Sequence, residues 1–316
     1  MGVCTLSDID LAFDGLYALS FMPSNTSILR LTRAKGNIDF SQLRFPDLLT
    51  EISLQECPIG LIIFPPFHLL SALSFINVRV GYIKFLEGGI TFKDIRIRHT
   101  PFTEIPPPIL GLVNLVRLDL TYSRMRQLSL DAIAGLGQLE ELNVSHNRIT
   151  TITMDDGWKC CRKLSILRLD GNRLVKFDFG LVLHMPRLYS LVLRQNRLTT
   201  LTCTVDTALA EKHNFCSWRS YFLAVRSGNG TAPQPSCSDF FANLQLIDLT
   251  YNKLTVLEMA SFEWMSALQD CRTAFNKIVN VKVESNRIPM LLNLSSLNNH
   301  LGYIHFLPKE VFSTEN

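Results

Sequence analysis

The middle of the chain carries a segment, LEELNVSHNRI at residues 139–149, that returns almost unchanged along the sequence. The next two copies are LSILRLDGNRL at residues 164–174 and LYSLVLRQNRL at residues 188–198. Each copy alternates apolar with polar residues and then places an asparagine shortly before a further apolar residue. This alternation predicts a short strand whose apolar side chains point to one face. The regular spacing of the copies predicts a stack of similar structural units that share one core.

The same frame continues outward in both directions with weaker matches. Its further copies are LQLIDLTYNKL (244–254), LQDCRTAFNKI (268–278), LVRLDLTYSRM (115–125), FKDIRIRHTPF (92–102), LSFINVRVGYI (73–83), LTEISLQECPI (49–59) and LSDIDLAFDGL (6–16). In the two copies nearest the N-terminus, this frame predicts that Cys57 and Asp14 replace the asparagine. An asparagine side chain can bond backbone groups of the turn and of the neighbouring coil, which explains its recurrence.

These segments resemble the leucine-rich repeat, L-x-x-L-x-L-x-x-N-x-L, over almost the whole chain. The resemblance implies an α/β solenoid, a curved horseshoe of about 12 repeats with a parallel β-sheet on its concave face. The segments NKLTVLEMASFEWMSALQ (252–269) and YIHFLPKEVF (303–312) are similar to repeats of Toll-type receptor ectodomains and secreted leucine-rich immune proteins. By contrast, FTEIPPPILGLVNL (102–115) resembles the shorter repeats of cytosolic scaffolds.

We expect a single solenoid over residues 1–316, made of four stretches. These are degenerate repeats at 1–110, regular repeats at 111–202, a lengthened repeat with cysteines at 203–240, and a regular part with an incomplete terminal repeat at 241–316. Counting back one repeat from Asn252 places Gly228 at the asparagine position, so SYFLAVRSGNG (220–230) predicts a hidden degenerate repeat. The residues before it, TVDTALAEKHNF (204–215), favour a helical bulge. Both ends of the chain fall inside a repeat, and we expect it to be part of a longer protein.

Composition narrows the classes of function. The formal net charge is +3 and 47% of the residues are hydrophobic, so bulk charge favours neither nucleic acid nor a membrane surface as a partner. The sequence holds no apolar run long enough for a membrane span, and its N-terminus lacks the features of a secretory signal. It also lacks phosphate-loop, G-x-S-x-G and H-E-x-x-H motifs. We therefore expect a protein that is not an enzyme and that needs no cofactor and no metal.

Three of the eight cysteines cluster in the lengthened repeat and are disulfide candidates, namely Cys203, Cys216 and Cys237. A bond from Cys203 to Cys237 would join adjacent coils, a bond from Cys203 to Cys216 would close the helical bulge, and Cys160 or Cys161 could supply a fourth partner. A zinc site that includes His213 can also be written, but its spacing matches no familiar tetrahedral set.

Outside this cluster, Cys271 falls in an inward apolar position, where a buried thiol acts as a small hydrophobic group. Four sequons are glycosylation candidates, at Asn25, Asn143, Asn229 and Asn293. Together with the clustered cysteines they favour an extracellular or cell-surface protein, and a cytoplasmic location is the alternative. A glycan on Asn143 would cover the centre of the concave face and move binding to its flanks or to the convex bulge.

The polar residues between the core positions point outward along the strands and form the candidate binding surface. The partner-binding candidates are Arg79, Arg96, Arg98, His99, Tyr122, His146, Arg168, Arg194, Arg226 and Tyr251. Arginine and tyrosine dominate recognition hot spots, so two basic areas on either side of Tyr122 and His146 predict an anionic or acidic protein partner. The alternative is that these side chains only keep a solvent-facing sheet polar.

These observations favour a recognition module without enzymatic activity. The resemblance implies binding of a protein ligand or a microbial surface molecule, in innate immunity or cell-surface recognition, and homo- or heterodimerisation. The alternative is a cytosolic leucine-rich scaffold or regulatory subunit. An enzyme built on a solenoid is the third hypothesis, and neither a nucleic acid partner nor a membrane span in this chain is expected.

Overall fold

The computed structural model of the chain describes residues 2–14, 16–66, 69–86, 91–154, 160–183, 185–204, 215–216, 238–239, 241, 243–262, 265, 267–284 and 293–307. The chain divides into two compact units, residues 1–152 and residues 153–316. Each unit is built from one repeated coil, in which a short strand is followed by a tight turn and a return segment.

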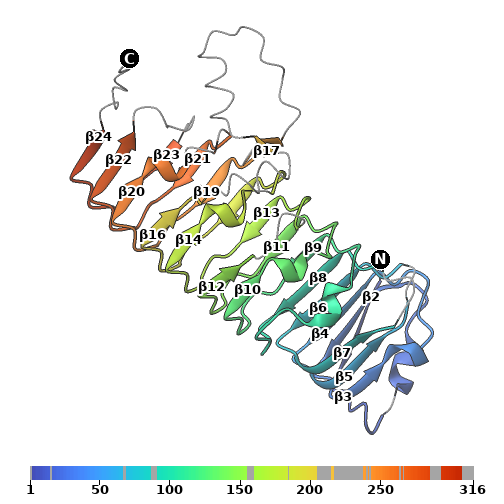
Figure 1. The fold of residues 1–316 in the computed structure, drawn as a ribbon. Coiled ribbons are helices and arrows are strands. Elements are labelled where there is room, and N and C mark those ends of the chain that lie inside the picture. The colour runs from blue at the N-terminus through green and yellow to red at the C-terminus, as the bar shows by residue number, and fades with distance from the viewer. Residues whose placement is uncertain are drawn as a thin grey trace. The chain divides into compact units, whose positions relative to one another are not determined.

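The first unit contains a parallel main sheet with one strand from each coil (Figure 1). Its strands are β1 (Gly2–Ser7), β2 (Thr26–Thr32), β4 (Glu51–Gln55), β6 (Ala72–Ile76), β8 (Asp94–Arg98), β9 (Arg117–Asp119) and β11 (Glu141–Asn143). Equivalent positions face each other along the sheet, as in the pairs Leu54 with Phe75 and Phe75 with Ile97. The strands are parallel because each coil returns to the same starting edge before the next strand begins.

A second, shorter row of strands lies on the return side of the first unit, where β3, β5 and β7 pair in parallel (Figure 1). The elements described on this side are β3 (Gly36–Asp39), β5 (Pro58–Phe64), β7 (Arg79–Phe85), β10 (Gln127–Ser129), β12 (Thr151–Thr153), the α-helix α1 (Pro107–Leu110) and the 3-10 turns Tyr17–Phe21, Phe40–Gln42 and Asp131–Ile133.

The second unit repeats the arrangement. Its parallel main sheet consists of β13 (Ile166–Arg168), β15 (Ser190–Val192), β19 (Leu246–Asp248), β21 (Asp270–Arg272) and β23 (Asn293–Ser295). Its other elements are β14 (Lys176–Asp178), β16 (Thr200–Thr202), β17 (Phe215–Cys216), β18 (Ser238–Asp239), β20 (Val256–Glu258), β22 (Asn280–Glu284), β24 (Tyr303–Leu307) and the 3-10 turns Phe179–Leu181 and Met259–Phe262.

The second unit corrects the prediction of a hidden repeat around Gly228. Strand β15 pairs directly with β19, and Ser190 faces Leu246, so no strand from residues 193–245 lies between them. The predicted repeat lacked both residues that tie a coil to its neighbours, since Ser220 stood for the first leucine and Gly228 for the asparagine. Residues 205–214 and 217–237, including the predicted helical bulge, lie outside the described residues.

The asparagines of the repeat join each coil to the one before it. Nδ2 of the buried Asn147 donates to the carbonyl oxygen of Leu120 at 2.8 Å, and its Oδ1 accepts the amide of Met125 at 3.1 Å. Equivalent bonds are made by Asn196, Asn252, Asn276 and Asn299. Backbone groups that would otherwise be buried without partners are thereby satisfied.

The structure confirms the prediction for Cys57 and corrects the one for Asp14. Cys57 is buried, and its Sγ contacts the carbonyl oxygens of Gln55 at 3.1 Å and Leu31 at 3.5 Å, in the place of the asparagine amide. In the first coil, Leu6 pairs with Leu31, so the asparagine position falls on the buried Ile9. Asp14 instead lies in a turn, where its Oδ2 accepts the amide of Asp10 at 2.9 Å.

Candidate binding surface

A line of residues with positive φ follows the main strands of both units, one residue before each asparagine position. We call this line the turn ladder. Its members have φ between 53° and 67° and are Asp8, Arg33, Glu56, Asn77, His99, Tyr122 and His146 in the first unit, and Gly171, Gln195, Tyr251, Phe275 and Asn298 in the second. Only one of them is a glycine, although positive φ costs other residues about 1–3 kcal/mol.

The left-handed backbone of the turn ladder has a structural cause. It directs the backbone amide of each ladder residue at a carbonyl oxygen of the next coil. The amide of Tyr122 donates to Ser145 O at 3.2 Å, that of Gln195 to Thr250 O at 2.9 Å, and that of Tyr251 to Ala274 O at 3.0 Å. The side chains of successive coils therefore project in register from the end of the sheet.

In the first unit, three side chains of the turn ladder form an aromatic stack. The ring centroids of His99 and Tyr122 are 4.5 Å apart, and those of Tyr122 and His146 are 4.4 Å apart, with the rings within 11° of parallel. Tyr122 remains 47% exposed. The structure thus brings together three of the predicted site residues, with the ring of Tyr122 stacked on both imidazole rings.

In the second unit, the turn ladder carries a second aromatic pair. The rings of Tyr251 and Phe275 lie 4.3 Å apart and nearly parallel, and the guanidinium carbon of Arg194 lies 5.1 Å from the centroid of Tyr251. Such a cation–π contact contributes about 0.5–1 kcal/mol at an exposed site. Tyr251 and Arg194 were predicted as site residues, and Phe275 joins them.

Two arginines of the basic area predicted from Arg79, Arg96, Arg98 and His99 are paired with carboxylates, Arg96 with Asp94 on its own strand β8 and Arg98 with Asp119 on the next strand. Arg96 Nη2 and Arg117 Nε lie 2.7 Å and 2.9 Å from Oδ2 of the buried Asp94. Arg98 Nε donates to Asp119 Oδ2 at 2.9 Å. The area is therefore a set of ion pairs, so it offers an anionic partner less positive charge than the sequence suggested.

Three further predicted site residues differ in their outcome. Arg79 does not join Arg96 and Arg98, because it begins β7 of the second row, whereas Ile76 faces Arg98 in the main sheet. Arg168 ends β13 and is exposed, as predicted for an outward position. Arg226 lies outside the described residues.

Two kinds of residue in this surface were missing from the predicted site. Asp94 as the partner of Arg117 and Asp119 as the partner of Arg98 become visible only when the strand register is known. Leu297, which is 73% exposed, lies in a coil whose repeat is too distorted to place from the sequence. Phe275 could have been found, since it occupies the same position as Tyr251 in a well-matched repeat.

The asparagines of the four sequons differ in their position and exposure. Asn25 is exposed in the turn before β2. Asn143 is half-buried at the end of β11, and its Oδ1 accepts the amide of Ser145 at 3.1 Å. Asn293 begins β23, with its side chain outside the described part of the chain, as is the whole of Asn229. Glycosylation of these residues stays a prediction.

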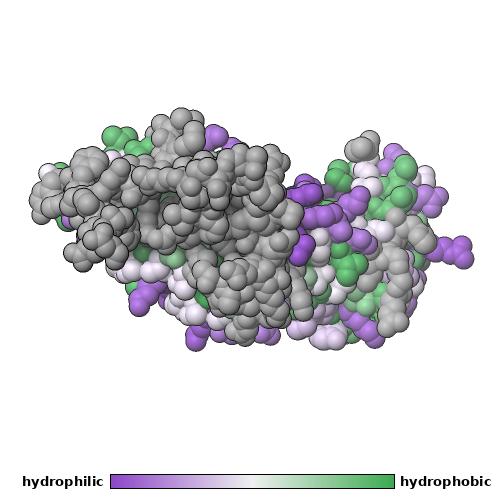
Figure 2. All heavy atoms as spheres, turned by 45° about the horizontal axis from the view of Figure 1, so that its top comes forward, coloured by the Kyte–Doolittle hydropathy of each residue, from purple (hydrophilic) through white to green (hydrophobic). Residues whose placement is uncertain are grey.

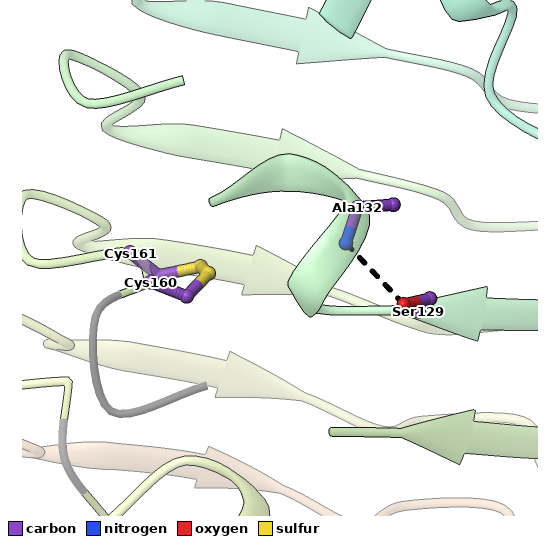
Figure 3. Close-up of a disulfide and its surroundings, with 4 residues drawn as sticks. All are labelled: Ser129, Ala132, Cys160 and Cys161. Carbon is purple, nitrogen blue, oxygen red and sulfur yellow. Dashed lines mark hydrogen bonds between the residues drawn. A yellow bond between two sulfur atoms is a disulfide. The ribbon is translucent and has the colours of Figure 1, made fainter. Parts of the chain in front are cut away.

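The cysteines are placed as follows. The adjacent residues Cys160 and Cys161 are joined in a disulfide and are buried (Figure 3). Figure 3 also draws a bond of the first unit, 3.3 Å long, from the Ala132 amide to Ser129 Oγ. Cys203 is half-buried, while Cys237, His213 and the side chain of Cys216 lie outside the described residues, so the predicted pairings and the zinc alternative stay untested.

Cys271 is buried in the inward position predicted for it, and burial raises the pKa of its thiol to about 12. The unfolded chain loses this proton above its ordinary pKa of 9.0, but the folded chain keeps it. This difference in pKa contributes to the free energy of unfolding. The contribution is fully present below pH 9 and is lost as the pH rises toward 12. We expect iodoacetamide at pH 8.5 to modify Cys4, which is half-buried, much faster than Cys271 in the folded protein.

Mass spectrometry of tryptic peptides would measure both rates. Addition of urea should make the two rates alike, because unfolding exposes both thiols. Equal rates without urea would contradict the buried placement of Cys271. A Cys271→Ala variant should lose the decline in stability between pH 9 and pH 12 that this thiol causes.

The described part of the chain has three general properties. On the face shown in Figure 2, hydrophilic residues lie beside hydrophobic ones throughout the described part. None of the helices in the described ranges has the length and apolar character needed to cross a bilayer. Within those ranges, no group of three or more His, Cys, Asp or Glu side chains is arranged to hold a metal ion.

Comparison with known proteins agrees with the geometry of the coil. Residues 93–149 match the family model described as leucine rich repeat. The fold of the chain is that of a leucine-rich repeat solenoid. Lumican of Gallus gallus is 27% identical over 177 residues, which cover 53% of the solenoid chain and 49% of lumican. Adenylate cyclase of Schizosaccharomyces pombe is 25% identical over 226 residues, which cover 68% of the chain and 13% of the cyclase. The chain thus spans about half or less of each relative.

The fold of this solenoid is also similar to a solved receptor structure. The crystal structure of the TLR13–ssRNA13 complex superposes with a TM-score of 0.54 at 16% sequence identity, over 92% of the solenoid chain and 35% of that chain. At this identity the likeness shows the fold alone, so any ligand of the solenoid has to be argued from its own surface.

Proposed function

We propose that this chain is a recognition module without enzymatic activity, which binds a protein partner through the outward side chains of its main sheets and its turn ladder. The observation that carries the proposal is the set of exposed aromatic side chains on the ladder. A solvent-facing sheet needs only polar side chains, whereas Tyr122, Tyr251 and Phe275 keep 42–47% of their surface exposed. Their stacking and their fixed backbone reduce the entropy that binding would cost.

A protein partner is favoured over a nucleic acid. Nucleic acid binding relies on several unpaired cations along a groove, but Arg96, Arg98 and Arg117 are held by Asp94 and Asp119. The net charge of +3 is also small. Extracellular or cell-surface recognition, including innate immunity, is the proposed setting, and a cytosolic scaffold is the alternative. Occupied sequons and oxidised cysteines in protein from secreting cells would support the first; unmodified sequons and free thiols would support the second.

The binding proposal is tested by paired substitutions on the ladder. Asn77 and Asn298 occupy ladder positions with φ of 54° and 55°, so asparagine keeps the backbone conformation. We expect the double variant Tyr122→Asn, Tyr251→Asn to lose a partner that the native chain retains, with affinity lowered by about 30-fold or more. Proximity labelling on cell surfaces would identify the partner, and calorimetry with the purified partner would measure the affinity.

The matched control is Tyr17→Asn, which removes a tyrosine that is 72% exposed but lies on the return side of the first unit. This variant should bind as the native chain does. Equal binding by the double variant, or an equal loss in the control, would count against the ladder as the recognition surface.

A further inference from the structure

Three exposed apolar side chains lie in successive coils of the second unit. Tyr251, Phe275 and Leu297 are 42%, 44% and 73% exposed. Tyr251 stacks on Phe275 at 4.3 Å, and the amide of Phe275 donates to Leu297 O at 2.9 Å. We call these three side chains the apolar platform. Isolated exposed apolar residues are ordinary, but a stacked aromatic pair with a further exposed apolar residue in the next coil favours an interaction site.

The apolar platform is held in a fixed conformation. Tyr251 and Phe275 are both members of the turn ladder with φ of 57°. The residues that follow them, Asn252 and Asn276, are buried and bond the preceding coils through Leu193 O and Leu249 O at 3.0 Å and 2.9 Å. A surface that is already ordered loses little entropy when a partner binds.

Arg194 gives the platform an available positive charge. Its guanidinium carbon lies 5.1 Å from the centroid of Tyr251, and within the described part of the chain it forms no ion pair. The neighbouring Arg272 differs, because its Nε donates to Asp270 at 2.9 Å. A guanidinium group that stacks on an aromatic ring keeps its in-plane N–H groups available for a carboxylate.

We propose that Arg194 and the apolar platform bind an acidic–apolar segment of a protein partner. An aromatic or aliphatic side chain of the segment packs against the exposed ring edges and Leu297, and an aspartate or glutamate close to it pairs with Arg194. This inference rests on the proposed function and names the chemical class of the partner at one place on the surface.

The geometry favours such a segment over single-stranded nucleic acid. Bases bind proteins by stacking on open aromatic faces. One face of Tyr251 is covered by Arg194 and the other by Phe275, so it has no face left for a base. Ring edges and a guanidinium group suit apolar side chains and carboxylates instead.

A selection from random peptides tests the inference, because it requires no purified partner. A random 12-residue peptide library displayed on phage is selected on the full chain. We expect enriched peptides to carry Asp or Glu within a few residues of Phe, Tyr or Leu. Calorimetry with a synthetic enriched peptide should show a loss of affinity of about tenfold or more in Arg194→Gln and in Tyr251→Asn. The charge reversal Arg194→Glu should change the selection to peptides with Lys or Arg beside the apolar residue.

The matched control is Tyr17→Asn, which removes a tyrosine that is 72% exposed but lies on the return side of the first unit, outside the turn ladder. It should leave peptide affinity unchanged, and circular dichroism should show that all variants, Tyr122→Asn included, are folded. Peptides without an acid, an affinity insensitive to Arg194→Gln, or no enrichment would overturn the inference. Binding lost in Tyr122→Asn but not in Tyr251→Asn would also overturn it while supporting the proposed function. If a uridine oligonucleotide binds tightly and Tyr251→Asn abolishes this binding, the site binds a nucleic acid and not a protein segment.

Discussion

Replacing Asn252 by alanine is expected to lower the free energy of unfolding by about 3–5 kcal/mol. Asn252 is 7% exposed, and its Nδ2 donates to Leu193 O and Leu249 O, each at 3.0 Å. Its Oδ1 accepts the amide of Leu198 at 2.9 Å. Alanine removes these partners and leaves buried backbone groups without hydrogen bonds, each at a cost of about 1–3 kcal/mol. The bond to Leu193 also connects two coils that are far apart in the sequence, on either side of the lengthened repeat.

Urea denaturation would measure this loss, and the neighbouring Lys253→Ala is the matched control. Lys253 is exposed, so its replacement should change the free energy of unfolding by no more than about 0.5 kcal/mol. Hydrogen exchange gives a local measurement, because the amide of Leu198 should exchange faster in Asn252→Ala. An unchanged exchange rate at Leu198, or equal stability of the two variants, would show that the asparagine does not join these coils.

The sequence predicted the fold best where both leucines and asparagines are present. In the repeats from Leu115 to Leu198 and from Leu244 to Ile278, the predicted core positions are buried and the asparagines make the expected bonds. The frame was wrong near β6, because Leu73-x-x-Ile76-x-Val78 and Leu70-x-x-Leu73-x-Phe75 both fit the pattern. Only the burial of Phe75 and its pairing with Leu54 separate these frames, and both depend on neighbouring coils. The misplacement of Arg79 followed from this ambiguity.

The candidate surface was predicted in its outward columns but not in its chemistry. The turn ladder holds residue types as different as Asp8, Arg33, Tyr122 and Phe275. Its left-handed backbone could therefore not be predicted from residue type. That conformation is imposed by the amide bond to the next coil and not by local preference. The pairing of Arg98 with Asp119 was likewise hidden, since it depends on which residues face each other across strands.

A second large effect is expected at Phe64, at the end of β5 in the first unit. Phe64 is fully buried, and its ring lies 5.3 Å from Phe40, 5.3 Å from Phe85 and 5.8 Å from Phe92. Phe64→Ala should lower the free energy of unfolding by about 3–5 kcal/mol, because it removes apolar contacts and leaves a cavity between coils. Phe64→Leu keeps most of the volume and should cost about 1–2 kcal/mol.

The matched control for this variant is Tyr82→Ala, on the adjacent strand β7, where the side chain is 59% exposed. It should change the stability by about 0.5 kcal/mol or less. In a solenoid each coil contacts mainly its neighbours, so the loss in Phe64→Ala should be concentrated in the first unit. Hydrogen exchange at the amide of Leu86, which donates to Phe64 O at 2.8 Å, should therefore accelerate while the amide of Leu254 in the second unit changes little. Uniform acceleration at both amides would instead mean that the two units unfold as one, and an unchanged rate at Leu86 would contradict the packing of Phe64 between Phe40, Phe85 and Phe92.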